Sequence, residues 1–66
     1  MDQKLMPSRI EHDLLKELAD NRNKAELMRL MAESTQGEVR SLYLQIAESF
    51  SHTASVIEEL MRMPRL

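Results

Sequence analysis

The chain has 66 residues, of which 42% are hydrophobic and 30% are charged, and its formal net charge is −2. These values indicate one small globular domain and exclude a disordered chain or a broad basic surface for nucleic acid or anionic lipid. The sequence has no cysteine, which excludes disulfides and thiolate metal sites. It also has no apolar run long enough to cross a bilayer or to act as a secretion signal, so we expect a soluble cytoplasmic protein without membrane contact.

The first predicted helix spans residues 8–33, after an N-terminal segment of residues 1–7 that we expect to be flexible. Ser8 and Glu11 form an S-x-x-E capping box, and Pro7 directly before them favours a helix boundary. Beyond this point apolar residues recur at helical spacing and predict a stripe that faces a core. The members of this stripe are Ile10, Leu14, Leu18, Ala25, Met28 and Ala32, with Leu15 and Met31 widening it.

A polar residue, Asn21, falls on this stripe between Leu18 and Ala25. Two interpretations are open. Asn21 is either a partly hydrated gap in the middle of a bundle, or a polar inner residue that fixes the register or the number of chains, as a buried Asn does in coiled coils.

The predicted turn occupies residues 34–37 and contains Gly37, the only glycine of the chain. Thr35 and Glu38 repeat the S/T-x-x-E pattern, so we expect Thr35 to cap a second helix. Glycine costs about 1 kcal/mol relative to alanine inside a helix but little at a helix end. Because a connection this short places two helices side by side, the sequence predicts an antiparallel hairpin.

The second predicted helix spans about residues 36–63 and is ended by Pro64. Its apolar residues alternate steps of three and four, which is the spacing of inner heptad positions. The predicted inner positions are Tyr43, Ile46, Phe50, Thr53, Ile57 and Leu60, flanked by Ala47, Ala54 and Met61 on one side and by Leu42 and Val56 on the other. This stripe is wider than a two-stranded seam needs, which predicts more than one neighbouring helix.

The predicted fold is therefore all-α, an antiparallel two-helix hairpin over residues 8–66 that dimerises into a four-helix bundle. The residues expected in its core or interface are Leu14, Leu18, Ala25, Met28, Leu42, Tyr43, Ile46, Phe50, Ile57 and Leu60. Further apolar residues, Leu27, Leu30 and Met31, make the end of the first helix apolar nearly all round. They belong either to the same dimer core or to an exposed patch that docks another protein.

The central stretch "KAELMRLMAESTQGEVRSLYLQIAESFSHTASVIEEL" resembles a group of short, uncharacterised alphaproteobacterial proteins, over roughly residues 22–60. The matching residues are Ala25, Glu26, Met28, Ala32, Glu33, Thr35, Glu38, Arg40, Leu44, Ala47 and Phe50. That group usually has Asp-Pro at the turn, where this chain has Gln36 and Gly37. The resemblance implies a bacterial helical hairpin and carries over no active site.

Candidate chemistry is sparse in this sequence. His52 follows Glu48 by four residues, so both could reach one ion, but the heptad pattern places them on a solvated face and predicts no metal site. No nucleophilic constellation or glycine-rich loop is present, so we expect no enzyme and no cofactor. Glu58 and Arg62 are spaced to pair along the second helix.

These features favour a small non-enzymatic interaction or regulatory protein that acts as a homodimer, with an unidentified protein partner. One alternative is a dimeric RNA-binding hairpin in which Arg22 and Arg29 of two chains form a basic patch, although nucleic acid is disfavoured because acidic residues alternate with the basic ones. A second alternative is a phosphorelay decoy or inhibitor, since His12 and Asp13 stand near the start of a helix as in kinase dimerisation hairpins.

Overall fold

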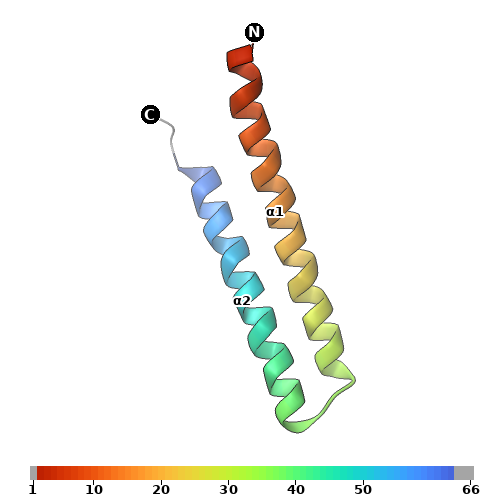
Figure 1. Ribbon diagram of the computed structural model, residues 1–66. Helices are drawn as coiled ribbons and strands as arrows, with labels where there is room; N and C mark the ends of the chain where they lie inside the picture. The colour runs from red at the N-terminus through yellow and green to blue at the C-terminus, as the bar shows by residue number, and fades with distance from the viewer. Residues whose placement is uncertain (1, 64–66) are drawn as a thin grey trace.

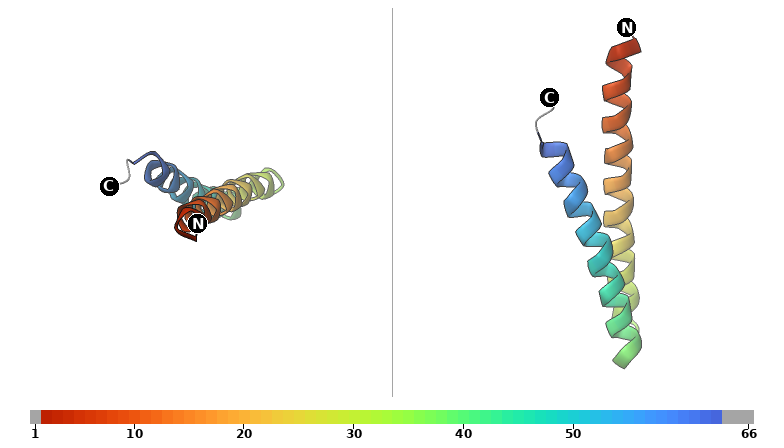
Figure 2. Two further views of the ribbon diagram at one scale, coloured as in Figure 1. Left: turned by 90° about the horizontal axis from the view of Figure 1, so that it is seen from above. Right: turned by 60° about the vertical axis from the view of Figure 1, so that its left-hand side comes forward.

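The computed structural model describes residues 2–63, with side chains described from residue 9 onward, and contains two helices. Helix α1 (Asp2–Glu33) and helix α2 (Gly37–Arg62) are joined by a short turn. The helices lie side by side and antiparallel, so the start of α1 and the end of α2 are at the same end of the molecule (Figures 1 and 2). The predicted all-α helical hairpin is confirmed.

Helix α1 begins at Asp2 rather than at Ser8. Ser8 therefore lies inside the helix and is not its N-cap, and residues 2–7, which we expected to be flexible, belong to α1. Pro7 removes one backbone hydrogen-bond donor, but its fixed φ of about −65° is compatible with a helix. The preceding residues include good helix formers such as Gln3, Lys4 and Leu5, so the helix extends beyond the capping box.

The end of α1 is closed by hydrogen bonds within its last turn. The N–H groups of Ser34 and Thr35 donate to the carbonyl oxygens of Met31 and Ala32 at 3.3 and 3.2 Å. The Thr35 hydroxyl also donates to the Ala32 carbonyl, at 3.2 Å. The predicted role of Thr35 as the cap of α2 is therefore wrong, because its hydroxyl completes α1 instead. The N-cap of α2 is Gln36, whose side chain makes no capping hydrogen bond.

The backbone reverses at Gly37, which has a φ of +64°. A residue with a Cβ is strained in this left-handed conformation, whereas glycine adopts it readily. A Cβ added at Gly37 would meet no atom within 4 Å, so the conformation and not crowding requires glycine. The only glycine of the chain thus stands where the turn needs it. At the other end of α2, Pro64 lies outside the described residues, and the extended Met63 closes the helix by donating its N–H to the Glu59 and Leu60 carbonyls.

The two helices pack along a seam of mostly small residues. Its buried members are 1–8% exposed: Leu18, Ala25, Ala32, Ala47, Ala54 and Ile57. Its half-buried apolar and aromatic members are Leu14, Met28, Tyr43, Phe50 and Met61. Four of the six buried residues are alanines, which allow the helix backbones to approach closely. Leu18, Ala54 and Ile57 form the densest cluster, with Leu14 and Met61 packed against it.

The seam of α2 differs from the predicted one at every second position. Tyr43, Phe50 and Ile57 lie on it as predicted. The alternate positions are filled by the predicted flanking residues, Ala47, Ala54 and Met61. The residues expected there, Ile46, Thr53 and Leu60, are exposed. Both sets have heptad spacing, and the set with two alanines is the buried one because branched side chains there would hold the helices apart.

Ile10 was predicted on the core stripe of α1 but is 56% exposed. The reason is the unequal length of the helices. Met61, in the last turn of α2, packs in the same cluster as Leu14, so the part of α1 before Leu14 extends past the end of α2 (Figure 1).

Candidate interaction surface

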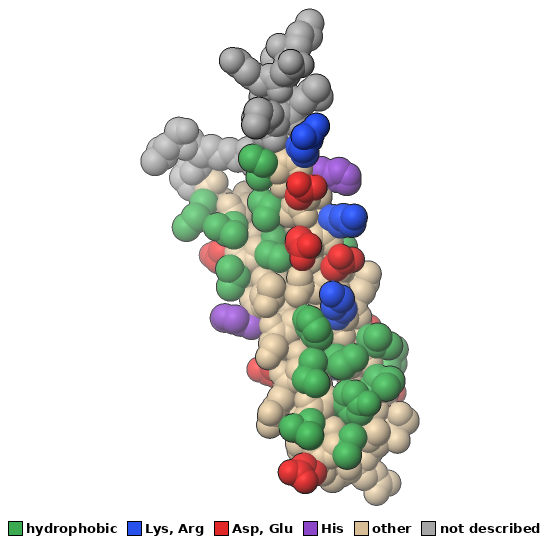
Figure 3. All heavy atoms as spheres, viewed as in Figure 1, with side chains coloured by type: hydrophobic (Ala, Val, Ile, Leu, Met, Phe, Trp, Pro, Cys, Tyr) green, Lys and Arg blue, Asp and Glu red, His purple; other side chains and the backbone are tan. Residues whose placement is uncertain are grey.

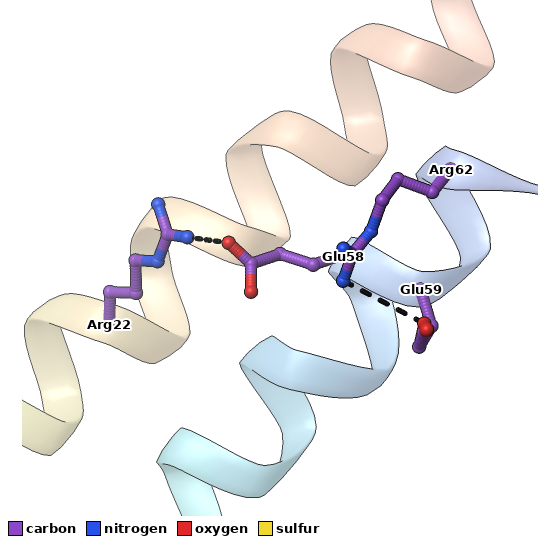
Figure 4. Close-up of polar contacts among 4 residues, drawn as sticks. All are labelled: Arg22, Glu58, Glu59 and Arg62. Atoms are coloured by element: carbon purple, nitrogen blue, oxygen red, sulfur yellow. Dashed lines mark hydrogen bonds and ion pairs between the residues drawn. The ribbon is translucent and has the colours of Figure 1, made fainter.

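Two polar contacts cross between the helices on one side of the hairpin. The Arg22 guanidinium forms an ion pair with Glu58 (Figure 4), and Arg29 donates from Nη2 to Ser51 Oγ at 2.7 Å. The two arginines are seven residues apart on α1, and their partners are seven residues apart on α2 in the opposite direction. This is the register of an antiparallel heptad pair. We call the side defined by Arg22, Arg29, Ser51 and Glu58 the polar face.

These contacts correct one expectation about charge. Glu58 pairs across the hairpin with Arg22 and not with Arg62, because the antiparallel register brings the two helices together there. Arg62 instead lies 3.7 Å from Glu59 (Figure 4). Arg22 and Arg29, the residues of the alternative RNA-binding interpretation, are 56% and 49% exposed. Each contacts an acceptor of its own chain, and Arg29 also lies 3.8 Å from Glu26.

The opposite side of α2 carries a second line of apolar residues. They recur in steps of three and four, interrupted midway by two polar residues, and the apolar members are 43–61% exposed. We call this line the outer stripe: Val39, Leu42, Ile46, Ser49, Thr53, Val56, Leu60 and Met63. Its members at 46, 53 and 60 directly precede the seam residues at 47, 54 and 61. One residue turns a helix by about 100°, so the outer stripe lies roughly a quarter-turn from the seam.

The two polar members of the outer stripe are already hydrogen bonded within α2. The Ser49 hydroxyl donates to the Gln45 carbonyl at 3.3 Å, and the Thr53 hydroxyl donates to the Ser49 carbonyl at 3.1 Å. A buried hydroxyl is costly only when its donor has no partner. The outer stripe could therefore be covered along its whole length without leaving a hydroxyl donor unsatisfied.

Helix α1 contributes an apolar patch near the turn, formed by Leu27, Leu30 and Met31, which are 40–52% exposed. We call these three residues the α1 patch. In Figure 3 hydrophobic side chains gather near the turn and again toward the other end of the hairpin on the side of α2, whereas acidic and basic side chains gather over the half of α1 away from the turn. The apolar surface of this hairpin is thus concentrated toward the turn and along α2.

The predicted core and interface residues divide into two groups. Those on the seam are Leu14, Leu18, Ala25, Met28, Tyr43, Phe50 and Ile57. Those on the outer stripe are Leu42, Ile46 and Leu60, which the other helix of the same chain does not cover. In the sequence, the outer stripe is recognisable because its members recur in regular steps of three and four from Val39 to Met63. Its members at 46, 53 and 60 each stand one residue before a seam position.

Asn21 lies half-buried on the seam, where the sequence placed it. Its Nδ2 donates to the Glu17 carbonyl of the preceding turn at 2.8 Å. One N–H of the amide is therefore paired within α1 rather than with α2. This arrangement allows a polar residue on the seam without an unpaired buried group.

The residues considered for chemistry lie on the exposed surface of the helices. His12, His52 and Glu48 are exposed, and within the described residues no group of three His, Asp or Glu is placed to hold a metal ion. A depression lined by Leu18, Arg22, Glu58, Met61 and Arg62 opens to solvent beside the interhelical ion pair. In the described part of the chain, neither helix is long and apolar enough to cross a membrane.

Comparison of the chain with family models, with curated proteins and with solved structures finds no match. The class of protein is therefore defined by the fold and its surface alone. It is an antiparallel helical hairpin with a polar face that links its two helices and an outer stripe that stays exposed among the described side chains of residues 9–63.

Proposed function

We propose that this protein is a small non-enzymatic interaction or regulatory protein that acts as a homodimeric helical bundle. The observation that carries the proposal is the imbalance between its core and its exposed apolar surface. The buried core consists of Leu18, Ile57 and four alanines, and within residues 9–63 no large side chain is fully buried. The larger apolar residues of α2 lie mostly on the outer stripe, and an exposed apolar line of this kind is typical of an interaction site.

The dimensions of the chain support association. Its accessible surface is 5696 Å², whereas a compact monomer of 7.7 kDa exposes about 4,300 Å². Its radius of gyration is 15.8 Å, against about 11 Å for a compact chain of this length. The surplus of about 1,400 Å² exceeds the roughly 800 Å² that each partner buries in an interface of standard size. The surplus surface is therefore large enough to include an interface of standard size with a second hairpin.

The free energy available from burying the outer stripe is comparable with the cost of association. Burying a fully exposed Val, Leu, Ile or Met contributes about 1.5–3 kcal/mol, so each half-exposed member contributes about 1 kcal/mol. Two copies bring twelve such side chains together, which amounts to roughly 12 kcal/mol. Association costs about 4–15 kcal/mol in lost translational and rotational freedom, so burial of the outer stripe is of the same magnitude as this cost.

Helix α1 is less suited to pair with a copy of itself. Its exposed residues ahead of the α1 patch include Asp13, Glu17 and Asp20. Antiparallel pairing over the full length of α1 would place the patch of one copy against these carboxylates of the other, which disfavours burial. We therefore assign dimerisation to α2 and the α1 patch to a different protein partner, because Met and Leu side chains adapt to varied apolar surfaces.

The first test is the mass of the protein in solution by light scattering coupled to size exclusion. We expect a dimer, and we expect Leu60→Glu on the outer stripe to give a monomer. The matched control is Leu15→Glu, because Leu15 is also 52% exposed but lies seven residues before Arg22 on the polar face. A monomeric wild type, or equal dissociation by both variants, would contradict the proposal.

The second test concerns the α1 patch. We expect the double variant Leu27→Glu/Leu30→Glu to remain dimeric and to lose a protein partner that the wild type retains in a pull-down. An unchanged set of partners would refute the docking role of the patch and leave the dimer untouched.

A further inference from the structure

We infer that the outer stripe of α2 is a self-complementary seam on which the α2 helix of a second copy binds antiparallel, about a two-fold axis at the level of Ser51. This inference rests on the proposed homodimer and specifies its face, direction and register. The occupant of the outer stripe is thus the same stripe of another copy of this chain.

The pattern of the outer stripe reads the same in both directions along α2. From either end it has three apolar residues, two small hydroxyl residues and three apolar residues, separated by steps of three, four, three, four, three, four and three. A second copy reversed about Ser51 therefore places apolar residues level with apolar residues and hydroxyl residues level with each other. The resulting layers are Val39 with Met63, Leu42 with Leu60, Ile46 with Val56, and Ser49 with Thr53.

The charges at the ends of α2 favour the antiparallel direction. Glu38 lies in its first turn and Arg62 in its last turn, directly before the two outermost members of the stripe. Antiparallel pairing places Glu38 of one copy beside Arg62 of the other at both ends, and the helix dipoles oppose each other. Parallel pairing would bring like charges together. Arg62 is free to change partners at little cost, since both it and Glu59 are more than two-thirds exposed in their ion pair.

The middle of the stripe suits close approach at the two-fold axis. Ser49 and Thr53 are small, and their hydroxyls donate to carbonyls of their own helix at 3.3 and 3.1 Å. Two α2 helices can therefore meet there without unsatisfied donors. The second α2 would lie about a quarter-turn around α2 from α1, so it would not compete with α1 for the seam.

Distances between spin labels test the direction and the register. The chain has no cysteine, so single cysteines introduced by Glu38→Cys, Gln45→Cys, His52→Cys and Glu59→Cys carry one label each. These exposed positions are seven residues apart along one line of α2, so the labels differ in height and not in side. With a rise of 1.5 Å per residue, we expect the two labels of a dimer to be separated along the axis by about 39, 18, 3 and 24 Å, respectively.

A label–label distance that is shortest at position 52 supports the inference. Similar short distances at all four positions would show a parallel pair, and a minimum elsewhere would show another register or face; either result overturns the inference while the dimer stands. Labelled proteins of monomeric mass would overturn the dimer as well. Unchanged circular dichroism relative to the wild type verifies that each labelled variant is folded.

A charge exchange tests the layer of Leu42 and Leu60 independently. We expect Leu42→Glu or Leu60→Lys alone to raise the dimer dissociation constant at least about tenfold. Both substitutions in one chain place a carboxylate opposite an ammonium group twice in the antiparallel dimer, so we expect affinity to recover relative to either single variant. A double variant weaker than both would overturn the proposed register.

Discussion

Replacing Ala25 by leucine tests whether the helices meet through small residues. Ala25 is 1% exposed, and the other buried alanines of the seam are 2–5% exposed. A leucine at this position adds an isobutyl side chain where α1 and α2 are in contact. The helices must then separate, or the new side chain must adopt a strained rotamer.

The expected cost follows from the lack of space. In an open site the added carbons would stabilise the protein by about 0.8 kcal/mol for each buried methylene group. In a packed site such additions destabilise by about 1–3 kcal/mol. For a domain of this size, 1 kcal/mol changes Tm by about 4–8 °C. We therefore expect Ala25→Leu to lower Tm by roughly 5–20 °C.

The assay is thermal unfolding followed by circular dichroism, at one protein concentration because the Tm of a dimer depends on concentration. The matched control is Ala19→Leu, since Ala19 is an exposed alanine of the same helix. It should change the free energy of unfolding by no more than about 0.5 kcal/mol. If Ala25→Leu is as stable as the wild type, the helices do not pack through the alanines, and the seam predicted through Ile46 and Leu60 regains support.

Three further variants probe the seam, the turn and the polar face. Asn21→Leu should raise Tm by several degrees, because it exchanges a half-buried amide on the seam for an apolar group; a lower Tm in calorimetry would contradict the inward placement of Asn21. Gly37→Ala should destabilise the protein by about 1–2 kcal/mol in urea unfolding, because its φ of +64° strains any residue with a Cβ; unchanged stability would mean that the turn adopts another conformation. Arg22→Ala should cost at most about 1 kcal/mol, and less at high salt, because the Arg22 and Glu58 side chains are 56% and 39% exposed; a larger, salt-independent loss would show that the ion pair is buried in the assembly.

Local patterns along the chain were enough to predict the hairpin. Helical spacing on both sides of a single glycine predicted two helices, and the short connection predicted their antiparallel packing, which the structure confirms. The same patterns misplaced both capping boxes. Ser8 lies inside α1, and the Thr35 hydroxyl closes α1, because an S/T-x-x-E sequence marks a possible start while neighbouring residues decide whether a helix begins there.

The choice between two apolar stripes on α2 needed the second helix. Tyr43, Phe50 and Ile57 lie on the seam in either case, so the spacing alone could not distinguish Ile46 and Leu60 from Ala47 and Ala54 as their companions. Hydrophobicity favours the larger residues, but two helices of one chain approach most closely through small ones. The preference for small residues at the contact depends on which residues α1 presents opposite α2. It leaves the larger side chains of α2 on the outer stripe. Periodicity therefore identifies the apolar faces of a helix, whereas packing between the helices selects which of these faces is buried within the chain.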